Sequence, residues 1–187
     1  MNRRMTALCL AAILLCGCLT LEHSLRLTEA NALIVGYVYT YDTAAEPTIA
    51  AALEEIPGLH WRFFDEKSVR DSLTRRNLEL VRYRKAVRGS RTTVEISVIS
   101  RNAAKTIASG AFPELRAPEE KSLEMTIPAG TIPADRLKRL LPDFKASLTI
   151  SVPGVIESTS GRRVDDETAV WEYTPGDAVV QPVIRWK

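Results

Sequence analysis

The feature that most constrains the fold is an alternation of apolar and polar side chains, which returns in segment after segment. In residues 21–27, His23, Leu25 and Leu27 alternate with charged or hydroxylated neighbours, and in residues 32–41 one side carries leucine, valine and three tyrosines. Successive side chains of a strand point to opposite faces, so this alternation is typical of half-buried strands. The two segments, joined by a short turn, are predicted to form a hairpin.

The same pattern predicts about seven strands, with helices between them. The predicted strands cover residues 21–27, 32–41, 78–87, 91–100, 122–127, 148–152 and 169–173. Helices are predicted over 48–56, from Asp65 onward, over 103–109 and from Pro133 to Leu141, since each begins near a capping residue or a proline. Strand pairs joined by tight turns, with helices in between, favour a single α+β domain with a largely antiparallel sheet.

The N-terminal segment differs from everything that follows it. Arg3 and Arg4 precede an uncharged run from Met5 to Leu15. A basic head followed by a short apolar run is typical of a secretory signal. The run is shorter than the roughly 20 residues of a membrane span. Such a segment can be a lipoprotein signal, a plain secretory peptide or a signal anchor.

A cysteine-containing motif ends this segment, Leu15-Cys16-Gly17-Cys18. It resembles the lipobox of bacterial lipoproteins, in which a diacylglyceryl group is attached to the Cys and the peptide is cut before it. The resemblance implies that residues 1–17 are a signal peptide and that Cys18 carries the lipid at the start of a domain over 18–187. Two or three acyl chains on one residue would anchor it firmly in a membrane. Leu19, in place of Asp after the Cys, favours the periplasmic face of the outer membrane over the inner membrane.

Composition excludes several classes of protein. All three cysteines lie within the first 18 residues, so the predicted domain has neither a disulfide nor a thiol nucleophile. Arg3 and Arg4 account for the formal charge of +2, and the rest of the chain has equal numbers of basic and acidic residues. A neutral domain gives no reason to expect a nucleic-acid partner.

Motifs for catalysis or metal binding are missing from the sequence. The domain has two histidines, His23 and His60, and neither belongs to a motif with metal-ligand spacing. No nucleophile elbow, phosphate-binding loop or dinucleotide fingerprint is present. The acidic run Asp165-Asp166-Glu167 can hold a divalent cation, although a solvated turn is the commoner role of such a run. We therefore expect no enzyme activity, no metal and no cofactor.

A basic stripe is the first candidate site. Between Arg75 and Arg91 the chain carries seven basic residues and one acidic residue. In a strand, Arg82, Arg84 and Arg88 share one side and can bind the phosphates of an anionic membrane, where each basic residue contributes about 1 kcal/mol. The alternative is an exposed strand whose charges keep a sheet edge soluble.

Aromatic residues supply the second candidate. Tyr37 and Tyr39 follow each other on one face of a predicted strand, and Trp61 lies in the most aromatic window of the chain. These three side chains can line a pocket for a lipid or glycolipid. The alternative is that the tyrosines make ordinary cross-strand contacts and that the window is an apolar connector on the core.

The C-terminal part carries a second resemblance. A strand, Pro153-Gly154, a further strand, Gly161, a polar turn and a strand with Trp171 follow one another. This order is similar to the ending of the mycobacterial LppM-type envelope lipoproteins. The resemblance implies a lipid-anchored α+β domain similar to hydrophobic-ligand-binding folds. Members often end in a membrane helix, whereas residues 181–187 here are too short and polar for one, so we expect the anchor at Cys18.

Two functions follow as hypotheses. The first is a membrane-anchored envelope lipoprotein that binds a lipid or another hydrophobic ligand without catalysis. The second is a structural or protein-interaction lipoprotein of the envelope with no small ligand. The sequence identifies no protein partner and does not decide between them.

Overall fold

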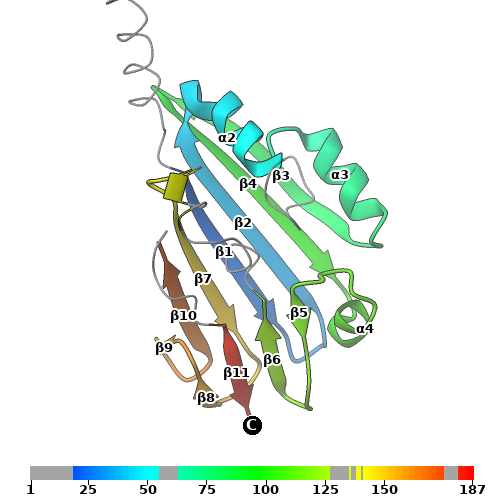
Figure 1. Ribbon diagram of the computed structural model, residues 1–187. Coiled ribbons are helices and arrows are strands. Elements are labelled where there is room, and N and C mark those ends of the chain that lie inside the picture. Colours follow the sequence, from blue (N-terminus) through cyan, green and yellow to red (C-terminus); the bar gives the residue numbers. More distant parts are fainter. Residues whose placement is uncertain (1–18, 55–62, 127–134, 136–137, 140, 175–180) are drawn as a thin grey trace, which may run out of the picture.

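A seven-stranded sheet in the order β3-β4-β2-β1-β7-β10-β9 forms the base of the molecule (Figure 1). The computed structural model describes residues 19–54, 63–126, 135, 138–139, 141–174 and 181–187. The sheet consists of β1 (Thr20–Leu27), β2 (Leu33–Asp42), β3 (Glu79–Arg88), β4 (Arg91–Ser100), β7 (Lys145–Ser151), β10 (Thr168–Tyr173) and β9 (Arg162–Arg163).

Two hairpins pair side by side through β2 and β4, and a parallel pair joins them to β7, β10 and β9. β1 pairs with β2 and β3 with β4, both antiparallel, as the alternating pattern predicts. The β3–β4 turn has only two residues, and Gly89 adopts a positive φ of 60°, which glycine tolerates without strain. β1 also pairs with β7 in parallel, which joins the first strand to the C-terminal half of the chain.

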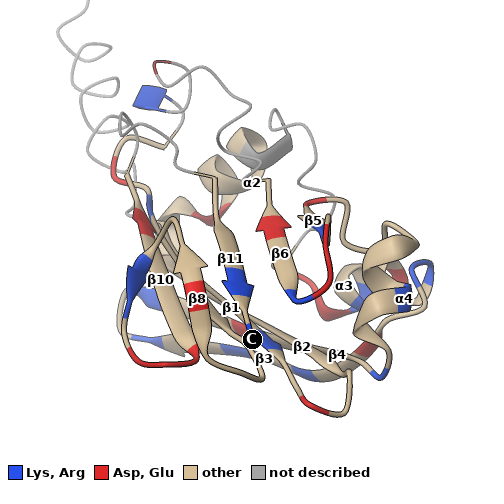
Figure 2. Ribbon diagram, turned by 90° about the horizontal axis from the view of Figure 1, so that it is seen from below, with Lys and Arg blue, Asp and Glu red and all other residues tan. Residues whose placement is uncertain are grey.

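A second, four-stranded sheet corrects the prediction of a single sheet. Its order is β5-β6-β11-β8, and it lies on one side of the larger sheet (Figure 2). The strands are β5 (Leu115–Arg116), β6 (Ser122–Met125), β11 (Val183–Trp186) and β8 (Ile156–Thr159). Alternation predicts β6 alone of these four, because β5 has only two residues and the side chains of β8 and β11 do not alternate between apolar and polar. The fold is still α+β, but it is richer in strands than expected.

The helices of the described residues lie on the same side as the second sheet (Figure 2). They are η1 (Thr43–Ala45), α2 (Glu46–Glu54), α3 (Glu66–Thr74) and α4 (Ala103–Ala108). The predicted caps are confirmed for two of them, since Asp65 accepts the Ser68 N–H and Asn102 accepts the Lys105 N–H. Most of the helix predicted from Pro133 to Leu141 lies outside the described residues.

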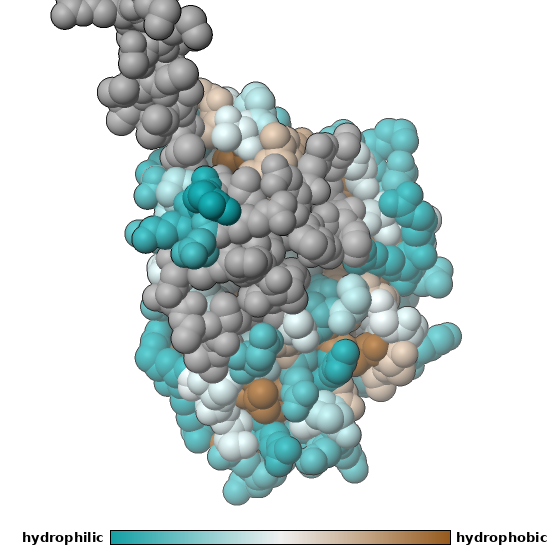
Figure 3. Space-filling model, in the orientation of Figure 1, coloured by the Kyte–Doolittle hydropathy of each residue, from teal (hydrophilic) through white to brown (hydrophobic). Residues whose placement is uncertain are grey.

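The large sheet therefore has an inner face under these elements and an outer face toward solvent. Its inner face forms the core, with side chains such as Leu25, Val35, Ile96 and Ile150 at most 1% exposed. On the outer face of β1, Glu22, Ser24 and Arg26 are exposed. The side of the molecule in Figure 3 is mainly hydrophilic outside the grey atoms, with apolar side chains showing as small separate spots.

Among the described residues, no helix combines the length and the apolar character needed to cross a bilayer.

Candidate functional sites: the aromatic strip and the basic hairpin

Four stacked rings cover the middle of the inner face, and we call them the aromatic strip: His23, Tyr37, Tyr39 and Phe63. The His23 and Tyr37 ring centroids lie 4.3 Å apart, and those of Tyr39 and Phe63 lie 3.8 Å apart with nearly parallel planes. β1 and β2 place the first three in register, because His23 pairs directly with Tyr37. The tyrosines of this strip therefore pack along one strand, as alternation predicts.

His23 is the unusual member of the strip. Its Nε2 atom is buried and has no hydrogen-bond partner among the described residues. Burial lowers the pKa of His23 from 6.5 to about 3, so the ring is neutral at physiological pH. Buried polar atoms of proteins nearly always have a partner, and an exception needs an explanation.

The predicted pocket residues Tyr37 and Tyr39 are 5% and 3% exposed. Burial raises the pKa of both phenols, which therefore stay neutral. Trp61, the third predicted pocket residue, lies outside the described residues. The structure thus shows a row of aromatic rings buried in the core, with one polar atom that has no described partner.

A hydrogen-bonded cluster lies next to the aromatic strip, at the end of β2. The Tyr41 hydroxyl donates to Glu46 at 2.7 Å, and the Lys85 ammonium donates to the same carboxylate at 2.9 Å. Burial acts to raise the pKa of Glu46, but the hydrogen bonds from Lys85 and Tyr41 outweigh it and lower the pKa. Lys85 therefore points to the inner side of the sheet and is already neutralised.

The basic stripe lies on β3, the edge strand of the large sheet. Arg82, Arg84 and Arg88 pair in register with Ser97, Glu95 and Arg91 of β4, which places all three on the outer face. Arg82 already has a partner, since its guanidinium lies 3.0 Å from the Glu95 carboxylate. Arg84 and Arg88 are exposed, and no described carboxylate forms an ion pair with them. The predicted set therefore divides into one paired arginine and two available ones.

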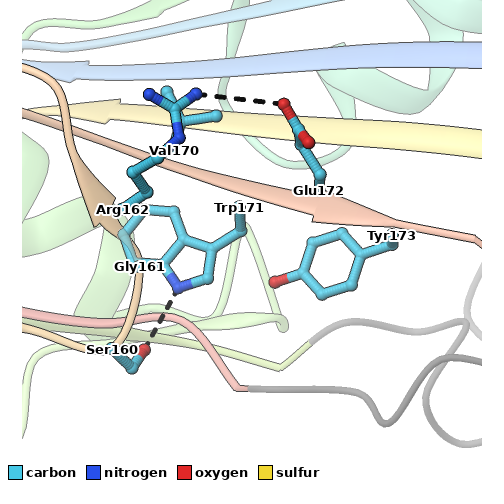
Figure 4. Close-up of a pocket in the computed structure, with 7 residues that line it drawn as sticks. All are labelled: Ser160, Gly161, Arg162, Val170, Trp171, Glu172 and Tyr173. Carbon is cyan, nitrogen blue, oxygen red and sulfur yellow. Dashed lines mark hydrogen bonds and ion pairs between the residues drawn. The ribbon is translucent and has the colours of Figure 1, made fainter.

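A shallow pocket of about 230 Å³ lies at the other edge of the sheet, around Trp171 (Figure 4). The indole N–H donates to Ser160 Oγ at 3.1 Å, and that oxygen also accepts the Val183 N–H and donates to the Gln181 carbonyl. Trp171 itself is only 4% exposed. Its polar atom is thus fully satisfied, and the ring serves as a packing anchor.

The domain thus has a mixed sheet in which the indole N–H of Trp171 has a hydrogen-bond acceptor and the buried Nε2 of His23 has no described partner. Among solved structures, the chain is similar to the folded domain of LppM from Mycobacterium tuberculosis, determined by NMR. The two share 12% identity with a TM-score of 0.52, over 91% of this chain and 90% of that one. At this identity the likeness concerns the fold, and it confirms the fold implied by the C-terminal resemblance. No family model matches the chain, and no curated protein does.

Two residues that matter here were not among the predicted site residues. His23 appeared in the sequence only as a histidine without a motif, although alternation already placed it on the apolar face with Leu25. Arg91 lay at the end of the basic window, and only the register of the hairpin brings it directly opposite Arg88. Cys18, the predicted lipidation site, lies outside the described residues.

Proposed function

We propose that this chain is a non-catalytic lipoprotein of the bacterial envelope, anchored through Cys18, whose domain holds an apolar ligand against the aromatic strip. One observation carries the ligand half of the proposal. The Nε2 atom of His23 is buried among aromatic side chains and has no described partner. Ligand sites are typically apolar surfaces with a few placed polar groups, and an unsatisfied polar atom in such a surface fits a ligand hydroxyl or carbonyl.

The anchor half of the proposal is supported by the lipobox resemblance. The fold likeness to the LppM domain agrees with it, because that fold was implied by the resemblance to envelope lipoproteins. β1 begins at Thr20, two residues after the proposed attachment point, so the lipid would be joined to the domain by a very short segment.

The ligand is tested by native mass spectrometry of the chain as the bacterium processes it. After exposure to extracted envelope lipids, we expect an added mass equal to one lipid. His23→Phe should lower the loaded fraction, whereas Thr149→Val, a control on the outer face of the sheet, should leave it unchanged. A clean mass for the exposed wild type contradicts the ligand site and leaves the anchor untouched.

The anchor is tested separately by metabolic labelling. Cells grown with labelled palmitate should transfer label to the wild type and none to Cys18→Ser. Equal labelling of the two, or no label on the wild type, contradicts the anchor whatever the lipid-loading experiment shows.

An interaction lipoprotein without a small ligand is the second candidate, and the open edge of β10 favours it. β9 pairs only with Ala169 and Val170, so no described strand pairs with Trp171 and Glu172 on that side of β10. An unpaired strand edge is a template for a partner strand. Crosslinking in cells from a probe at Glu172 should capture a protein if this function holds, and no captured protein would count against it.

A further inference from the structure

We propose that the turn of the β3–β4 hairpin, residues 87–91, contacts the phosphates of an anionic bilayer and thereby orients the domain on the membrane. We call these residues the hairpin tip. The membrane is the surface that the proposed function supplies, so the inference rests on that function for its setting. The charge and register observations that carry it are independent of the lipid on Cys18.

The charges at the hairpin tip are unbalanced. Arg88 and Arg91 form the last cross-strand pair of the hairpin, with both side chains on the outer face. Like charges directly opposite each other destabilise a hairpin. Arg88, Arg91 and the neighbouring Arg84 are exposed, and none forms an ion pair with a described carboxylate. A phosphate group between the arginines would relieve this repulsion and accept their hydrogen bonds.

The acidic residues near the tip are already engaged. Glu95 binds Arg82, and Glu46 binds Lys85 and Tyr41. Asp42 lies in the same row as Arg91, and its carboxylate accepts the Ala44 N–H as a helix cap. Asp42 thus offsets one of the three available arginine charges, and the tip keeps a net positive charge.

The register places the hairpin tip beside the start of the domain. Thr20 pairs with Thr40, Thr40 with Thr93, and Thr93 with Ala86, so Thr20 and Ala86 share one row of the sheet. The Arg88–Arg91 pair lies two residues beyond this row, about 7 Å at the rise of a strand. A lipid attached at Cys18, two residues before Thr20, lies at most about 7 Å from Thr20. A lipid at Cys18 can therefore lie at the level of the tip, and Figure 1 shows the β3–β4 turn at the end of the sheet where β1 begins.

The tip also presents an apolar side chain. Val87 is 58% exposed between Lys85 and Gly89, on the side of the hairpin opposite the arginines. Segments that lie in the headgroup layer of a membrane typically combine exposed apolar side chains with cationic neighbours, as this valine does.

The opposite end of the sheet provides the contrast. There Arg163 lies 2.6 Å from Asp166, and Arg162 lies 3.9 Å from Glu172. Those arginines have partners and the turn between β9 and β10 is acidic, so this end should face away from an anionic surface. Val164 in that turn is 54% exposed, which makes it a matched control for Val87.

Environment-sensitive labels test the orientation. The processed chain has no free thiol once Cys18 is acylated, so Val87→Cys and Val164→Cys each accept a single fluorophore. In vesicles containing phosphatidylglycerol, we expect the label at position 87 to shift to the blue and to be quenched by brominated lipid. The label at position 164 should remain in water. Equal signals from the two positions would overturn the inference.

Charge removal tests the chemistry. The triple variant R84Q/R88Q/R91Q should abolish the spectral shift of the label at 87, and R26Q/R162Q/R163Q, with the same change in net charge, should preserve it. If the chain is isolated without a lipid, its flotation with the same vesicles at low salt is measured instead. The first triple variant should then bind roughly a hundredfold more weakly than the second. The same loss of signal in both triple variants contradicts contact between the hairpin tip and a lipid surface. A spectral shift of the label at 87 that occurs in whole envelopes but not in pure lipid vesicles also contradicts it, and indicates a protein partner.

Discussion

Trp171 and His23 lie in one row of the large sheet, since both pair with Leu148. Their ring nitrogens nevertheless differ in hydrogen bonding. At the Trp171 corner the indole N–H has Ser160 as its acceptor, and Ser160 in turn is bound on both sides. At the centre of the sheet the His23 Nε2 has no described partner. The hydrogen bonds of the Trp171 corner serve stability, and the proposed function assigns the His23 nitrogen to ligand binding.

The largest expected effect is the loss of the Trp171 anchor. Trp171→Ala removes a ring that packs against the backbone of Gly161, where an added Cβ would lie 2.4 Å from the indole. We expect the free energy of unfolding to fall by about 4 kcal/mol, the usual cost of truncating a buried aromatic residue. Urea denaturation of the purified protein measures it. A loss below 1 kcal/mol would mean that the corner is not structural and would break the comparison.

The second effect concerns pH and belongs to His23. In the unfolded chain its imidazole takes up a proton below about 6.5, whereas in the folded protein the pKa is about 3. The unfolded state therefore binds more protons in this window, and stability must fall as the pH falls. Between pH 6.5 and 5.0 we expect a loss of about 1 to 2 kcal/mol in the ligand-free protein.

Denaturation curves at the two pH values check this prediction, and the second histidine supplies the control. His60→Gln should retain the loss and His23→Phe should remove it. A pH dependence that disappears with His60 instead would show that His23 is not the titrating group.

A third effect sharpens the description of the Trp171 corner. Ser160→Ala leaves the indole N–H and the Val183 N–H without their acceptor. A donor stripped of its partner costs its desolvation penalty, so we expect a loss of about 1.5 kcal/mol. Ser160→Thr keeps the oxygen and is the matched control. Equal stability of Ser160→Ala and wild type would show that water replaces the hydroxyl.

The local parts of this fold were predictable from the sequence. β4 has the predicted bounds, and helices begin after Asp65 and Asn102 as predicted, because period-two alternation and capping depend on neighbouring residues. The second sheet was not predictable. Ile184 of β11 pairs with Leu123 of β6 and with Thr159 of β8, and contacts between such short and distant segments leave no period in the sequence.

The candidate sites were predictable to a similar degree. Alternation placed the tyrosines on one face and the arginines on the other side of their strand, as the structure has them. Alternation does not predict the hydrogen-bond and ion-pair partners of these side chains, because the partners lie on the opposing strand and on α2. Glu95 of the next strand forms an ion pair with Arg82 and not with Arg84. The alternating pattern does not distinguish the two arginines.

The smallest expected change, and the one that separates stability from binding, is His23→Phe. Phenylalanine fills the same stacked position against Tyr37 without a buried, unpaired nitrogen, so the ligand-free protein should become more stable by about 1 kcal/mol. The same substitution removes the polar contact offered to a ligand, so lipid loading should weaken roughly tenfold. A residue kept for packing alone would change both quantities in the same direction. Opposite signs, from denaturation and native mass spectrometry on the same protein, identify His23 as a binding residue; loss of stability together with loading assigns it to the core.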